Sequence, residues 1–169
     1  MKTTLLMVGA LVLAIPVLIY AIGASLPVEH VAEHQRVVNL PVERVALLIR
    51  DVGTHPNWRP DVKKIDILEP APDLRYRETS KHGEIVFRFR ETERNARFES
   101  TIDDPKLPFG GRWTITLLSN GNSTQVSIRE DGEVYSSLFR FFSRFVFGHD
   151  TNILAYLAAL EKYAAIGGR

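Results

Sequence analysis

Six stretches in the middle of the chain alternate apolar and polar residues with a period of two, and this pattern constrains the fold most. They lie between residues 62 and 130 and are separated by turn-forming clusters, for example at residues 70–73, 81–83 and 119–122. Successive side chains of a β-strand point to opposite faces, so each stretch predicts a strand with one buried and one solvated face. The sequence therefore predicts a six-stranded antiparallel meander, preceded by a short strand at residues 36–40.

An apolar stretch, residues 136–163, follows the predicted strands. Its apolar residues recur three and four positions apart, which places them on one side of a helix; they are Leu138, Phe142, Phe145, Ile153, Leu157 and Leu160. A sheet with one apolar face and a helix with one apolar side must be buried against each other. Residues 148–150 interrupt the pattern, and Asp150 or Thr151 is a candidate N-cap for a second helical segment.

The N-terminal part of the chain has a different character. Residues 3–28 carry no charged side chain, and a bilayer core needs about 20 apolar residues in a helix. We predict a single-pass transmembrane anchor at residues 1–28 that meets the membrane through residues 3–28. A polar linker, residues 29–35, then leads to a domain outside the cytoplasm, because Lys2 precedes the apolar run. A cleaved signal peptide is the alternative, since residues 23–25 are small.

Composition narrows the possible chemistry. A net charge of +1 gives no argument for nucleic-acid binding, and the absence of cysteine excludes disulfides and thiolate chemistry. His30 and His34 are four residues apart but have no third ligand in sequence, so no metal site is predicted. The chain has no phosphate-binding loop or hydrolase motif, and no cofactor is expected. Arginines at positions 75, 77, 88, 90, 94 and 97 alternate with glutamates and predict a solvated, ion-paired sheet face.

The order of the predicted elements resembles that of a known superfamily. The segment LPVERVALLIRDVGTHPNWRPDVKKIDIL, residues 40–68, resembles the first strand, short helices and Trp-containing corner of the START-like (SRPBCC) superfamily of polyketide cyclase/dehydrase and lipid-transfer domains. GGRWTITLL and STQVSIREDGEVYSSLFRFFSRFVFG resemble its last two strands and the start of its terminal helix. We assign residues 36–166 to such a domain. The resemblance implies an α+β helix-grip fold, in which a curved antiparallel β-sheet wraps around a long C-terminal α-helix and encloses an apolar cavity.

Candidate site residues follow from the face of the strand to which each side chain is predicted to point. Glu130 and Glu78 share the apolar face of their strands, so each is predicted to face the helix, where a carboxylate can orient a polar ligand group or act in acid–base chemistry. The alternative is that both reach water or pair with arginine. The candidate catalytic residues are Glu130, Glu78 and Tyr76. The predicted ligand-binding residues are Trp58, Tyr76, Phe87, Phe89, Phe98, Trp113, Ile115, Glu130, Phe142 and Phe145.

The segment FRFFSRFVF, residues 139–147, holds five phenylalanines, more than one helix face can bury against a sheet. Together with Arg140 and Arg144 it is typical of an interfacial helix beside anionic lipid, or it is covered by neighbouring loops. Three functions stay open. The leading hypothesis is a membrane-anchored module that binds a hydrophobic small molecule or lipid between sheet and helix. The others are a cyclase/dehydrase-like enzyme and a protein-interaction domain with a vestigial cavity.

Overall fold

A single antiparallel sheet forms the body of the molecule. The structure is a computed structural model that describes residues 2–81, 83–148 and 150–166; the side chains of residues 2–13 and 147 lie outside the description. Seven strands take the order β1-β7-β6-β5-β4-β3-β2. They are β1 (Glu29–Val38), β2 (Val62–Glu69), β3 (Leu74–Ser80), β4 (Gly83–Glu93), β5 (Arg97–Ile102), β6 (Phe109–Asn120) and β7 (Ser123–Val134). The predicted six-stranded meander is confirmed in β2 to β7, each of which pairs with the next.

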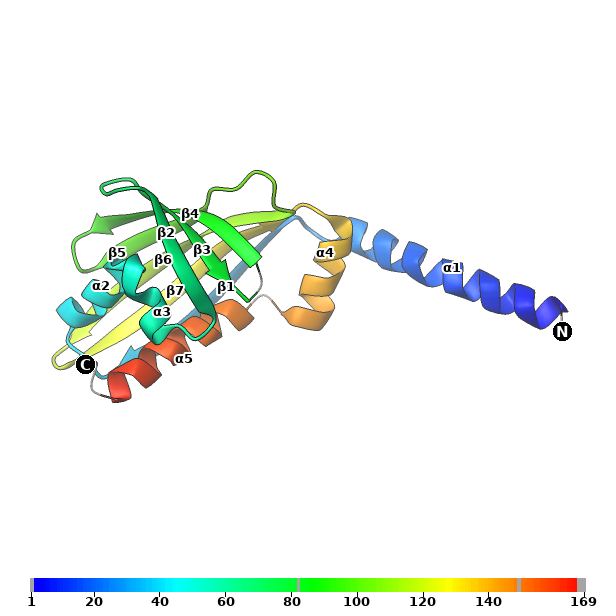
Figure 1. Ribbon diagram of the computed structural model, residues 1–169. Helices are drawn as coiled ribbons and strands as arrows, with labels where there is room; N and C mark the ends of the chain where they lie inside the picture. Colours follow the sequence, from blue (N-terminus) through cyan, green and yellow to red (C-terminus); the bar gives the residue numbers. More distant parts are fainter. Residues whose placement is uncertain (1, 82, 149, 167–169) are drawn as a thin grey trace.

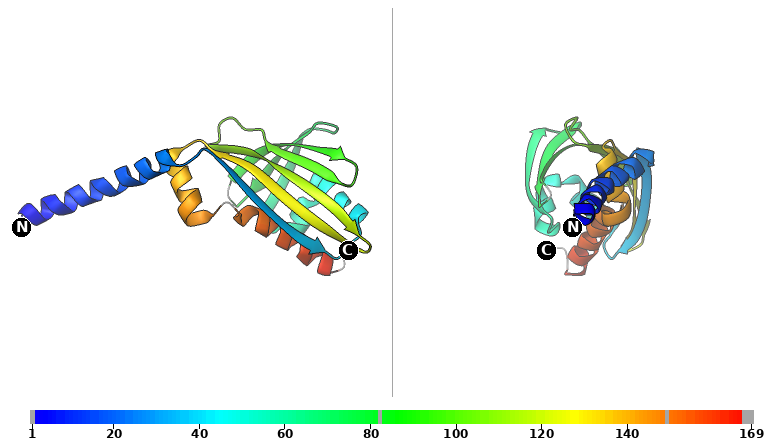
Figure 2. Two further views of the ribbon diagram at one scale, coloured as in Figure 1. Left: turned by 180° about the vertical axis from the view of Figure 1, so that it is seen from behind. Right: turned by 90° about the vertical axis from the view of Figure 1, so that its right-hand side faces the viewer.

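The concave side of the sheet holds the short helices that follow β1 and the C-terminal helix (Figure 1). Between β1 and β2 the chain forms α2 (Val42–Arg50), the 3₁₀ turn η1 (Val52–Thr54) and the short helix α3 (His55–Trp58). Helix α5 (Thr151–Ala165) lies along the inner face, and Figure 2 shows the sheet curling around it. Ile153, Leu157 and Leu160 of α5 are at most 1% exposed. They share one core with Val126 and Ile128 of β7. The predicted α+β helix-grip architecture is confirmed.

Strand β1 is longer than the sequence predicts. Residues 29–35, predicted as a linker, pair with β7 from Glu29↔Glu133 to Gln35↔Ser127. The prediction is wrong because β1 lies at the sheet edge, and its inward positions in this part are His30, Ala32 and His34 rather than large apolar residues. Strand pairing depends on backbone hydrogen bonds, which a polar side-chain pattern does not reveal.

The C-terminal stretch is divided as predicted. Helix α4 (Ser137–Phe142) continues into a π-helical turn, η2 (Ser143–Phe147), and the chain then turns at Gly148, whose φ is 75°. Helix α4 contains no buried residue among those described. Leu138 and Phe145 are 45% and 60% exposed, so they do not continue the buried stripe of α5. The turn at Gly148 separates the apolar residues of α4 and η2 from those of α5. The spacing of three and four residues, taken alone, predicts that they form one continuous apolar face.

Helix α1 (Lys2–Ser25) extends away from the sheet (Figures 1 and 2). In the part of the chain that the structure describes, no helix has the length and apolar character required to cross a membrane. The first half of the predicted anchor, residues 2–13, lies outside the residues whose side chains are described. The anchor therefore stays a prediction.

Candidate functional site

A buried ion pair joins the end of α3 to β3 on the concave side of the sheet. Arg59 donates two hydrogen bonds to Glu78, from Nη1 to Oε2 at 2.7 Å and from Nη2 to Oε1 at 3.0 Å. Glu78 is only 8% exposed because it alternates inward with Tyr76 on β3. Two parallel charge-assisted hydrogen bonds hold both side chains in a fixed orientation. Glu78 therefore faces inward, as its position on the strand predicts, and it pairs with arginine, as the alternative predicts; its catalytic role stays a prediction.

Asp61 is a second carboxylate beside Arg59. Its Oδ2 accepts a hydrogen bond of 2.9 Å from Nη2 of Arg59. Burial opposes the charge of Arg59, but Glu78 and Asp61 outweigh that effect and raise the pKa of the guanidinium. Burial also raises the pKa of Glu78, against the opposing effect of Arg59. One cation therefore faces two carboxylates, and the cluster has no excess positive charge to offer an anion.

Tyr156 of α5 occupies the centre of the interior. The guanidinium carbon of Arg59 lies 5.3 Å from the centre of its ring. Its ring meets Trp58 and Trp113 edge-on, with centroids 5.1 Å and 5.7 Å away. Burial raises the pKa of both Tyr156 and Tyr76, so both phenols are protonated at neutral pH. Tyr76, a candidate catalytic residue in the sequence, therefore stays protonated even above the usual pKa of a tyrosine.

Trp58 lies at the corner that the two flanking prolines predict. It is 6% exposed and contacts His55 edge-on at 5.2 Å. His55 is 3% exposed, and burial followed by the charge of Arg59 lowers its pKa to about 3. Within the described residues, Trp58 Nε1, Arg59 Nε and His55 Nδ1 have no hydrogen-bond partner. A buried polar group left unpaired costs about 1–3 kcal/mol. The corner therefore holds buried polar atoms that have no hydrogen-bond partner among the described residues.

A second polar cluster surrounds Glu130 on β7. Trp113 Nε1 donates to Glu130 Oε2 at 2.6 Å, and His30 Nε2 lies 3.1 Å from Oε1. Trp113 and Glu130 are paired neighbours across β6 and β7. Gly132 makes room for the imidazole, because a Cβ there would lie 2.3 Å from His30 Cε1. The side chain of Glu130 is 17% exposed. It faces inward as predicted, with both oxygens engaged.

The structure brings most of the predicted ligand-binding residues together. Tyr76 stacks on Phe87 at 5.5 Å, and Phe89 stacks on Phe98 at 5.9 Å. Ile115 is 2% exposed in the same core. Phe142 and Phe145 lie apart from this group, on α4 and η2. Sequence reasoning missed Arg59, Tyr156 and His30. The only signal for Tyr156 was a hydroxyl within the apolar stripe of α5.

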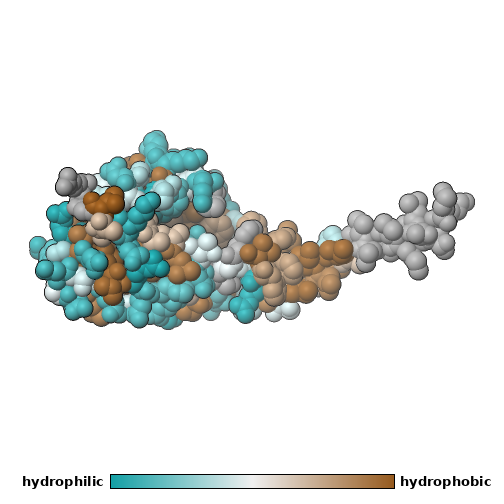
Figure 3. All heavy atoms as spheres, turned by 90° about the horizontal axis from the view of Figure 1, so that it is seen from below, coloured by the Kyte–Doolittle hydropathy of each residue, from teal (hydrophilic) through white to brown (hydrophobic). Residues whose placement is uncertain are grey.

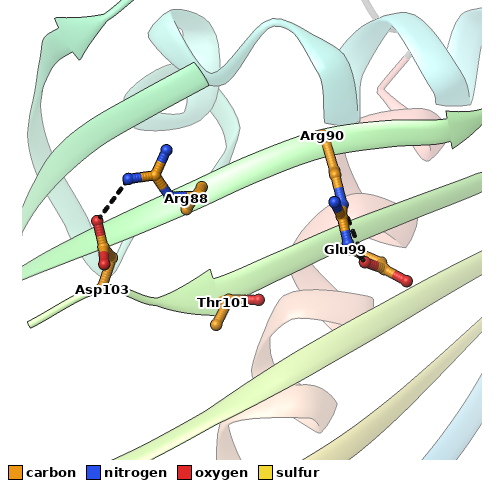
Figure 4. A pocket seen from close by; sticks show the side chains of 5 residues that line it. All are labelled: Arg88, Arg90, Glu99, Thr101 and Asp103. Atoms are coloured by element: carbon orange, nitrogen blue, oxygen red, sulfur yellow. Dashed lines mark hydrogen bonds and ion pairs between the residues drawn. The ribbon is translucent and has the colours of Figure 1, made fainter. Parts of the chain in front are cut away.

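The described pockets lie elsewhere. A pocket of about 400 Å³ is lined by Arg50, Glu91 and Arg94. Figure 4 shows a smaller one of about 150 Å³ on β4 and β5, lined by Arg88, Arg90, Glu99, Thr101 and Asp103. Its arginines pair with Asp103 at 3.2 Å and Glu99 at 2.7 Å, which confirms the predicted ion-paired face. Neither pocket is lined by α5, so the predicted cavity between sheet and helix stays a prediction. Within the described residues, no group of three His, Asp or Glu side chains is placed to hold a metal ion.

A curved antiparallel sheet that encloses a C-terminal helix, with polar clusters inside an aromatic interior, defines a helix-grip domain. Residues 38–155 match the family described as polyketide cyclase / dehydrase and lipid transport. The chain belongs to this family. A search of curated proteins found no match.

Solved structures show the same fold at low sequence identity. A START superfamily protein from Mycobacterium smegmatis is 16% identical with a TM-score of 0.66, over 81% of this chain and 98% of that one. The ZhuI aromatase/cyclase from Streptomyces sp. R1128 is 15% identical with a TM-score of 0.69, over 83% and 96%. Thalictrum norcoclaurine synthase is 14% identical with a TM-score of 0.65, over 84% and 98%. These likenesses establish the fold alone.

Proposed function

We propose that this protein is a membrane-attached binding module that holds a hydrophobic small molecule or lipid between its sheet and α5. The observation that carries the proposal is the buried corner at Trp58 and Arg59, where two N–H groups lack partners among the described residues. Ligand sites are mostly apolar, with a few polar groups that fix orientation. The family's description, which includes lipid transport, supports the same class of ligand.

The charges at the corner select the polar group of the ligand. Trp58 Nε1 and Arg59 Nε are donors, so they need an acceptor. Arg59 already faces Glu78 and Asp61. A neutral carbonyl or ester oxygen therefore fits better than a carboxylate. The aromatic residues of β3 to β6 would contact the apolar part of the molecule.

Attachment to the membrane is assigned to α1. Its 24 residues give a helix of about 36 Å at 1.5 Å per residue, against a hydrocarbon core of about 30 Å. The described part of α1 does not by itself meet the requirements of a membrane span, so the proposal relies on the sequence of the whole helix. Residues 3–28 carry no charge. With Lys2 retained on the inner side, the domain lies outside the cytoplasm.

Titration of the full-length protein in detergent tests the binding proposal. Methyl palmitate and palmitate are compared by the change in tryptophan fluorescence. We expect saturable binding of both, with the ester bound more tightly. Trp58→Phe keeps an aromatic side chain, although a smaller one, and removes the donor, so it should weaken ester binding by about tenfold, the effect of one lost hydrogen bond of about 1.4 kcal/mol. Tyr135→Phe, at an exposed tyrosine, is the matched control. Absence of saturable binding of either probe would refute the proposal.

The contact between His30 and Glu130 favours a second function, an enzyme of the cyclase/dehydrase type. A carboxylate that orients an imidazole is a common acid–base arrangement. Here the same carboxylate also accepts the hydrogen bond from Trp113, and Glu78 is paired with Arg59. These bonds occupy the candidate acids, so we rank binding first. If the protein is such an enzyme, Glu130→Gln should abolish turnover of a bound ligand and leave the affinity for that ligand unchanged.

A further inference from the structure

An exposed apolar surface lies where the domain meets α1. We name it the α4–η2 surface and define it by Leu138, Phe139, Phe145 and Val146, which are 45%, 48%, 60% and 60% exposed. Figure 3 shows hydrophobic residues gathered at this junction and along the adjoining part of α1. On α1, Val17, Leu18 and Tyr20 are 68%, 60% and 61% exposed. The apolar surface thus extends over two elements far apart in sequence.

The two elements are held together at Gly23. A Cβ at this position would lie 1.9 Å from the carbonyl oxygen of Ser137, so only glycine permits the close approach of α1 and α4. Arg140 reinforces the junction: its Nε donates to the Gly23 carbonyl at 2.8 Å, and Nη1 donates to the carbonyls of Val134 and Tyr135 at 3.1 Å and 3.0 Å. The cation also lies near the C-terminus of α1, where the helix dipole favours positive charge. The α4–η2 surface therefore has a defined position relative to α1.

The direction of α4 indicates what covers its surface. In Figures 1 and 2, α4 runs across the end of α1 rather than along it. If α1 enters a bilayer steeply, α4 lies close to the bilayer plane, at the level where α1 leaves it. An interfacial helix has this placement, with aromatic and aliphatic residues toward the acyl chains and cations near the headgroups. Arg144 of η2 is exposed and supplies such a cation.

We propose that α4 and η2 form an interfacial element that inserts Phe145 and its apolar neighbours into the phospholipid bilayer entered by α1. This inference rests on the membrane attachment proposed above. The bilayer is favoured over a second copy or a protein partner because the surface continues that of α1. The sequence of α1 from Thr3 onward carries no charge. A bilayer covers both elements at once.

The absence of cysteine makes the test direct, because a single introduced cysteine is labelled without background. The full-length protein is reconstituted in phosphatidylcholine vesicles, with and without phosphatidylglycerol, carrying the environment-sensitive dye NBD at position 145. Leu118 is the matched control, since it is 57% exposed and lies near the end of β6 remote from α1. A label at Leu18 reports on α1 itself. Quenching by lipids with a spin label near the headgroup measures insertion.

We expect blue-shifted emission and strong quenching at positions 18 and 145, and neither at 118. Arg144→Glu should reduce quenching at 145 only in the anionic vesicles. Quenching at 18 without quenching at 145 would overturn the inference and leave the attachment of α1 standing. No quenching at either position would refute the attachment as well. A blue shift at 145 that rises with protein concentration in detergent would instead identify a second copy as the occupant. A label at Val146, also 60% exposed, provides a second site if substitution of Phe145 impairs folding.

Discussion

Helix α5 and the preceding α4–η2 segment come from one apolar stretch of the chain but occupy opposite environments. In α5 the apolar residues form a single stripe, and Ile153, Leu157 and Leu160 are at most 1% exposed. In α4 the apolar residues surround the helix, and none of those described is buried. The comparison teaches that apolar content alone does not determine which residues are buried. Burial requires apolar residues along one side of the helix and an apolar sheet face that packs against them.

The arginines of the two regions differ in the same way. Arg59 lies beside α5, and its charge is balanced by Glu78 and Asp61 in the interior. Arg140 in α4 donates mainly to backbone carbonyls at the junction with α1. The first arginine stabilises the interior of the domain, whereas the second joins the domain to its N-terminal helix. The two regions should therefore respond differently to substitution.

The largest effect is expected from Glu78→Leu, which leaves the buried Arg59 with only the more exposed Asp61. Removing one partner of a buried ion pair costs about 3–5 kcal/mol, and Asp61 compensates only part of the remaining charge. Chemical denaturation of the variant measures it. Arg59→Met combined with Glu78→Leu should recover most of the stability, because no uncompensated charge remains. A double variant as unstable as the single one would show that packing, not charge, dominates at this corner.

The second test compares leucines on the two segments. Leu160→Ala in α5 removes a fully buried side chain and should lower the free energy of unfolding by about 2–5 kcal/mol. Leu138→Ala in α4 makes the same chemical change at a 45% exposed site and should stay within about 0.5 kcal/mol. Thermal and urea unfolding of the pair give the difference. Equal losses would break the comparison, because α4 would then share the core of α5.

Acid should lower the stability of the region around α5 through His55, because burial lowers the pKa of this residue from 6.5 to about 3. Below pH 6.5 the unfolded chain binds a proton that the folded chain excludes, so stability is retained above this pH and lost toward pH 3. The slope for one proton is about 1.4 kcal/mol per pH unit. His55→Gln should remove this contribution, seen as a flatter dependence of unfolding free energy on pH. Identical slopes would mean that His55 has the same pKa in the folded and the unfolded protein.

Much of the fold could be predicted from the sequence. Alternation such as that of Phe87 and Phe89 with Arg88 reports strand faces directly, because one face is buried and the other solvated. The break at Gly148 was also visible as a change in pattern. Residues 29–35 could not be recognised as a strand, since their inward side chains include His30 and His34. Such an edge strand is specified by its partner, β7, and not by its own periodicity.

The candidate site was predicted less completely. The alternation of residues placed Glu78 and Glu130 on the inner face, because the apolar residues two positions away show which side of each strand is buried. The alternation gave no means of choosing the partners of the two carboxylates. Arg59 follows Trp58 in a corner without periodicity, and His30 was assigned to a linker. The pairs Arg59–Glu78 and His30–Glu130 join residues 19 and 100 positions apart. Pairing at that distance depends on sheet curvature and helix placement, which a single sequence does not encode locally.

The smallest effect on domain stability is expected at the junction of α1 and α4. Gly23→Ala places a methyl group against the Ser137 carbonyl, so the two helices must separate. Because the α5 core is not involved, the unfolding free energy of the domain should change by less than about 0.5 kcal/mol. Spin labels at positions 18 and 146 should nevertheless show a longer and broader distance distribution in pulsed electron spin resonance.

Gly121→Ala is the control for this experiment. Gly121 has a φ of 62°, so an alanine there also strains the backbone, but the residue lies in the β6–β7 turn, away from α1. An unchanged distance in Gly23→Ala would show that α1 is not held by α4. A large loss of stability would show that the junction belongs to the core, and the contrast between the two segments would then fail.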